Sequence, residues 1–160
     1  ALRPWPQMGA GVTGLYLRFA DYQINDGRLL EIPAGGSTIS QRHLYEKGVY
    51  VIGGSGYTVF QQEGKAADRV DWSPGDLFAV PLNVRHQHFN DGDGPARLLA
   101  VTSFPLVLNV TADERFVGFC GSALAAQGRR KEARAHALAN TVRHEPCRPI
   151  GTNLKLALQL

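Results

Sequence analysis

The chain has 160 residues, 44% hydrophobic and 19% charged, which is the composition of one globular domain with its own core. Its net charge of +3 arises from residues 121–160, where a basic run at 129–131 lacks the interleaved aromatic side chains typical of nucleic-acid binding. No apolar run approaches the roughly 20 residues that cross a bilayer, and the N-terminus lacks the pattern of a secretory signal. We therefore expect a cytoplasmic protein with no membrane segment and no nucleic-acid partner.

Short strands separated by glycine and proline turns are predicted along most of the chain. They cover residues 14–20, 28–32, 49–52, 57–61, 69–72, 77–80, 86–89 and 96–102. Several of these segments alternate apolar and polar residues, as half-buried strands do. No helical pattern lies between them, so the sequence predicts a β-sandwich or barrel and excludes alternating strands and helices.

The composition changes after Phe119. Residues 122–140 are rich in alanine and arginine and predict a helix, with Ser122 as its N-cap. Residues 154–158 either form an extra strand or dock on a partner. We therefore divide the chain into an N-terminal arm (1–11), a barrel (12–119) and a basic extension (120–160).

Two stretches have the spacing of a β-barrel signature. The first reads Gly35-x5-Gln41-x-His43-x3-Lys47-x6-Gly54, and the second reads Gly75-x5-Pro81-x4-His86-x3-Asn90. They resemble the two motifs of the cupin superfamily, Gly-x5-His-x-His-x3-4-Glu-x6-Gly and Gly-x5-Pro-x-Gly-x2-His-x3-Asn. The chain is similar to single-barrel bacterial cupin-domain proteins over residues 12–110. It departs from the pattern at Gln41, Lys47 and Asn83.

The resemblance implies an all-β fold, a double-stranded β-helix or jelly-roll barrel, here with a short C-terminal helical extension. It also implies a divalent metal held in the barrel by three histidines and one glutamate. Residues two apart on a strand share a face, so Gln41 and His43 can both point inward. We predict that Gln41, His43 and His86 hold Fe, Mn, Ni or Zn. His88 is either a fourth ligand or a histidine that orients one.

Lys47 stands where the resemblance implies a glutamate. A protonated lysine cannot bind a metal ion, so Lys47 is either solvated or a desolvated amine acting as a base or Schiff-base nucleophile. Alternatively, a bulge at Gly48 turns Glu46 inward and supplies a carboxylate. Lys47 and Glu46 are therefore the candidate catalytic residues.

Three functional hypotheses follow. The first is a metal-dependent enzyme of dioxygenase type acting on an aromatic or enol compound, with isomerase or decarboxylase chemistry as variants. The second is a metal-free, non-enzymatic cupin that binds a small organic ligand. In the third, the chain pairs with another barrel, most simply as a homodimer.

Overall fold

The structure is a computed structural model that describes residues 1–112. Its elements are β1 (Arg3–Pro4), a 3-10 helix (Pro6–Met8), β2 (Thr13–Arg18), β3 (Asp26–Ile32), β4 (Lys47–Gly53), β5 (Gly56–Gln61), β6 (Asp68–Trp72), β7 (Leu77–Val80), β8 (Arg85–Asn90), β9 (Ala96–Thr102) and α1 (Phe104–Thr111). The predicted all-β fold is confirmed, and the described chain ends in one short helix, α1, which lies before the predicted one. The helix expected over 122–140 and the segment 154–158 lie outside the described residues.

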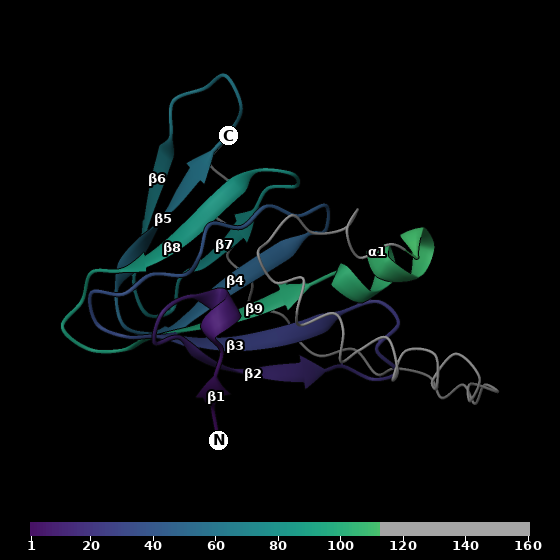
Figure 1. Ribbon diagram of the computed structural model, residues 1–160, viewed down its shortest axis with the longest axis horizontal. Coiled ribbons are helices and arrows are strands. Elements are labelled where there is room, and N and C mark those ends of the chain that lie inside the picture. The colour runs from purple at the N-terminus through teal and green to yellow at the C-terminus, as the bar shows by residue number, and fades with distance from the viewer. Residues whose placement is uncertain (113–160) are drawn as a thin grey trace.

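The strands form two antiparallel sheets that face each other (Figure 1). The larger sheet has the order β1-β2-β3-β9-β4-β7, and the smaller has the order β6-β5-β8. Two isolated bridges, Ser37 with Phe89 and Gln41 with His86, attach the segment before β4 to the free edge of β8. The segment that carries the first motif is therefore attached to β8, the strand that carries His86 of the second motif.

A short helix, α1, follows β9 directly. It begins with a proline in its first turn, where the missing N–H is no loss, and ends at Ala112 in a left-handed conformation. The sequence does not indicate α1, because Val107 and Val110 are β-branched and the apolar run is short. No helix within residues 1–112 is long and apolar enough to cross a membrane.

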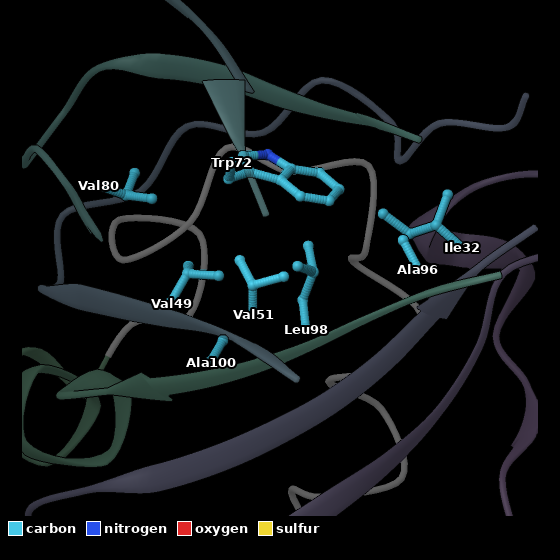
Figure 2. Close-up of a cluster of buried hydrophobic side chains, with 8 residues drawn as sticks. All are labelled: Ile32, Val49, Val51, Trp72, Val80, Ala96, Leu98 and Ala100. Atoms are coloured by element: carbon cyan, nitrogen blue, oxygen red, sulfur yellow. The ribbon is translucent and has the colours of Figure 1, made fainter. Parts of the chain in front are cut away.

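The interior between the sheets is apolar at one end (Figure 2). Alternating residues of β4 and β9 point inward there and meet Trp72 from the smaller sheet. The buried cluster comprises Ile32, Val49, Val51, Trp72, Val80, Ala96, Leu98 and Ala100. The other end of the interior holds buried polar side chains instead.

The register of β4 decides which side chain of the first motif enters the interior. β4 pairs regularly from Lys47 to Val51 with β9, and the irregularity lies later, between Val51 and Gly53. Lys47 is consequently 5% exposed, whereas Glu46 is exposed to solvent. The alternative with a bulge at Gly48 and an inward Glu46 is wrong, because no residue is inserted there to reverse the alternation.

Substitution of Leu98 tests the packing of the apolar core, because the Leu98 side chain is 1% exposed. We expect Leu98→Ala to lower the free energy of unfolding by about 3 kcal/mol, the usual cost of a cavity in a packed core. Urea denaturation measures this change in the free energy of unfolding. Leu82→Ala, at a side chain that is 52% exposed, should change stability by less than about 0.5 kcal/mol. Equal costs at both positions would contradict the described core.

Candidate functional site

Five polar side chains of the two motifs gather in the buried interior. They are Gln41, His43, Lys47, His86 and His88, and none is more than 5% exposed. Polar groups buried in this way are costly unless they find partners. Their hydrogen bonds therefore define what the site can do.

Strand pairing brings these residues together. The backbone N–H groups of Gln41 and His86 each donate to the other residue's carbonyl oxygen, at 2.8 Å in both directions. His43 lies two positions after Gln41 and enters the same space, where its ring centroid is 4.9 Å from that of His86. His88 follows two positions after His86 and shares its face of β8.

Lys47 lies at the centre of the cluster. Its Nζ atom is 3.3 Å from His86 Nε2 and 3.2 Å from His88 Nε2. An ammonium group has hydrogens to donate and no acceptor. Two imidazole nitrogens from β8 thus contact the end of a lysine side chain from β4, a strand of the other sheet.

The outer ring nitrogens of two histidines contact backbone carbonyl groups. His43 Nδ1 lies 2.9 Å from the Tyr45 carbonyl oxygen, and His86 Nδ1 lies 3.3 Å from that of Val84. A carbonyl oxygen only accepts, so Nδ1 carries the hydrogen in both rings. Their Nε2 atoms therefore present lone pairs to the interior.

Two further contacts orient the histidines, and the motifs did not reveal them. The Tyr45 ring stacks on His43 with centroids 3.9 Å apart. Thr58 Oγ1 lies 2.8 Å from His88 Nδ1 and accepts a hydrogen bond from Trp72 Nε1 at 3.1 Å. Thr58 pairs with His88 across β5 and β8, so a correct strand register would have identified it.

The imidazole rings are neutral at physiological pH. Burial, followed by the nearby charge of Lys47, lowers the pKa of His43 to about 3 and that of His86 to about 2. The same two causes hold the pKa of His88 well below its usual range. The histidines therefore serve as hydrogen-bonding groups and do not add positive charge to the site.

Two atoms of the cluster have no hydrogen-bond partner within the described part of the chain. They are Gln41 Nε2, a donor, and His43 Nε2, which presents its lone pair. Leaving a buried donor or acceptor unsatisfied costs roughly 1–3 kcal/mol each. A bound molecule that reached these two atoms would satisfy both of them.

The predicted metal ligands do not fit a divalent ion as they are arranged. Within residues 1–112, no group of three or more His, Cys, Asp or Glu side chains is placed to hold a metal ion. A metal bound by His86 and His88 would lie about 2.1 Å from each Nε2 atom. Lys47 Nζ already contacts both atoms and stands where the ion would have to lie.

A family model described as a cupin domain matches residues 28–102. No curated protein sequence matches the chain. Solved structures resemble the fold of this chain, but their sequence identities are below 25%, so the likeness concerns the fold alone.

Peruvianin-I, a cysteine peptidase from Thevetia peruviana latex, aligns with a TM-score of 0.57 and 21% identity over 64% of this chain and 66% of its own. The polyketide cyclase RemF from Streptomyces resistomycificus aligns at 0.52 and 22%, over 64% and 72%. Oxalate decarboxylase from Lactobacillus farciminis aligns at 0.60 and 17%, over 88% of this chain but 39% of its own. These neighbours have different activities, so the shared fold does not select a reaction.

Replacing the lysine tests whether its ammonium excludes metal. We expect Lys47→Glu to bind about one Zn²⁺ or Ni²⁺ per chain, because a carboxylate would join imidazoles whose outer nitrogens are already anchored. Metal analysis after loading and dialysis measures this. The wild type and Lys65→Glu, a matched change at an exposed lysine, should retain less than about 0.1 ion. Equal metal content in all three proteins would refute the exclusion.

Proposed function

We propose that this chain, whose residues 28–102 match a cupin-domain model, binds a small organic acid inside the barrel without a metal ion. The supporting observation is the position of Lys47 Nζ between His86 Nε2 and His88 Nε2. The ammonium supplies the positive charge that would attract an anion. Neutral histidines around it add no competing charge.

The unsatisfied atoms narrow the class of ligand. Gln41 Nε2 can donate to a carboxylate oxygen, and His43 Nε2 can accept a hydrogen bond from a hydroxyl group. A small hydroxy acid carries both groups. We therefore favour a hydroxy acid, aliphatic or aromatic, over a neutral ligand, because opposite charges would attract a carboxylate to the Lys47 ammonium.

A metal-dependent dioxygenase acting on an aromatic or enol compound is the competing function. The lone pair of His43 Nε2 favours it, since that atom is free to bind a metal ion. It requires that Lys47 move away from His86 and His88. A role for Lys47 as base or Schiff-base nucleophile also stays a prediction.

We further propose that two copies of the chain pair through the outer face of the larger sheet. Strand register places Leu15, Leu29, Leu99, Tyr50 and Leu77 in one row across β2, β3, β9, β4 and β7. Leu15, Tyr50 and Leu77 are each at least 39% exposed. Apolar patches of this kind mark interaction surfaces.

The charges on this face favour a second copy as the partner. The outward positions of these five strands carry only two charged side chains, Glu31 and Arg97, whose Oε2 and Nε atoms are 2.6 Å apart. The pair compensates its own charge, so identical faces do not repel each other. An apolar face whose charged side chains compensate each other is also the kind of surface that a twofold interface uses.

Organic acids and their uncharged amides test the interior site. We expect lactate or salicylate to raise the melting temperature by several degrees at about ten times its Kd, while lactamide and salicylamide do not. Differential scanning fluorimetry measures the shift. Lys47→Met should abolish it, because the substitution removes the charge and keeps a similar volume, whereas Lys65→Met should retain it.

The metal-dependent alternative gives a different pattern in the same assay. A chelator such as EDTA should not change the melting temperature of a metal-free binding protein. A large drop with EDTA, reversed by adding back one metal, would contradict the proposal. So would an equal response to the acids and their amides.

Light scattering tests the dimer. We expect a mass of twice the 17.4 kDa chain. Leu77→Lys should shift the protein to monomer, because it places a charge in the row of apolar residues. Val70→Lys, at a similarly exposed residue of β6 on the other sheet, should leave the dimer intact. A wild type that stays monomeric at high concentration would overturn this part of the proposal.

A further inference from the structure

We propose a second binding site, on the outer surface of the barrel, for the phosphate group of a small phosphorylated polyol. A pocket of about 520 Å³ lies at the end of β5 and β8. Its polar lining comprises Arg42, Gln61, Gln62, Glu63, Asn83 and Arg85. This volume is in the range of small-molecule sites.

Strand alternation places the pocket on the face opposite the buried cluster. Arg42 lies between two inward residues, Gln41 and His43, and Arg85 immediately precedes the inward His86. Both arginines therefore point outward. The interior site and the outer pocket use the same strand segments but different faces.

The two arginines flank the same bridge and line the same pocket. Gln41 pairs with His86 in an isolated antiparallel bridge, so Arg42, which follows Gln41, and Arg85, which precedes His86, stand on the same side of it. Like charges placed near each other repel. A bound anion between the guanidinium groups would offset that repulsion.

Hydrogen bonds fix one of the guanidinium groups. Arg42 Nε donates to the backbone oxygen of Asn83 at 3.1 Å and to its Oδ1 atom at 2.9 Å. Asn83 has a φ of 61°, a left-handed conformation that asparagine adopts more readily than most residues. The terminal nitrogens of Arg42 keep their hydrogens for a ligand.

Neither Arg42 nor Arg85 forms an ion pair within residues 1–112, in contrast to Arg28, Arg69 and Arg97. Glu63 lines the same pocket without forming an ion pair with either one. The charge of both guanidinium groups is therefore available to an anion.

The chemistry of the lining favours a phosphate monoester. Such a group carries about two negative charges near neutral pH and three terminal oxygens, and guanidinium groups bind these oxygens in pairs. The remaining lining offers amide groups from Gln61 and Gln62 and a carboxylate from Glu63. Amides and a carboxylate suit the hydroxyl groups of a polyol.

Isothermal titration calorimetry at constant ionic strength tests the site, with glucose 6-phosphate as the probe. We expect binding of glucose 6-phosphate and none of glucose. Arg85→Gln and Arg42→Gln should each raise the Kd at least about tenfold, because each removes charge-assisted hydrogen bonds. Arg3→Gln, an equal change of net charge at an exposed residue of β1, should change the Kd less than about twofold.

Three results of this titration would overturn the proposal or its phosphate assignment. Arg85 is exposed, so Arg85→Gln should fold, and an unchanged Kd in that variant would overturn the proposal. Absence of glucose 6-phosphate binding to the wild type would do the same. Succinate bound as tightly as glucose 6-phosphate would refute the phosphate assignment. Lys47→Met should leave this affinity unchanged, which separates the outer pocket from the interior site.

Discussion

The contact between the Lys47 ammonium and the two histidines of β8 links the two sheets at the polar end of the interior. β4 belongs to the larger sheet and β8 to the smaller. Lys47 Nζ contacts His86 Nε2 and His88 Nε2 within 3.3 Å. These contacts give the two buried Nε2 atoms a partner and place the lysine between them. The proposed ligand class and the expected absence of metal both depend on them.

The period of two residues along a strand lets one short segment serve two surfaces. On β8, His86 and His88 point inward while Arg85 points outward, and the segment attached to it places Arg42 outward beside two inward residues. The rigid pairing between Gln41 and His86 therefore positions both sites. On the larger sheet the same alternation separates the packed core from the apolar outer row. No additional element is needed to create these surfaces.

Much of the architecture was predictable from local pattern. Glycine and proline turns between short alternating segments indicated the strands, and the motif spacing indicated that His43 and His86 would approach each other. Their ring centroids are 4.9 Å apart. The apolar core also follows from apolar residues at alternate positions of β4 and β9.

Other features depend on register and could not be read from single residues. Glu46 and Lys47 are neighbours, and only the pairing of β4 with β9 decides which one is buried. Thr58 orients His88 through a cross-strand contact between residues 30 positions apart. The shared pocket of Arg42 and Arg85 likewise appears only when two distant segments are aligned. α1 was missed because a short apolar run with β-branched residues does not distinguish helix from strand.

The most direct test of the central contact is a nitrogen-15 NMR spectrum of the imidazole rings in the full chain. The described geometry predicts that His43 and His86 carry hydrogen on Nδ1 and a lone pair on Nε2, with a slowly exchanging Lys47 ammonium coupled to the His86 ring. Hydrogen on His86 Nε2, together with a rapidly exchanging Lys47 amine, would contradict the account.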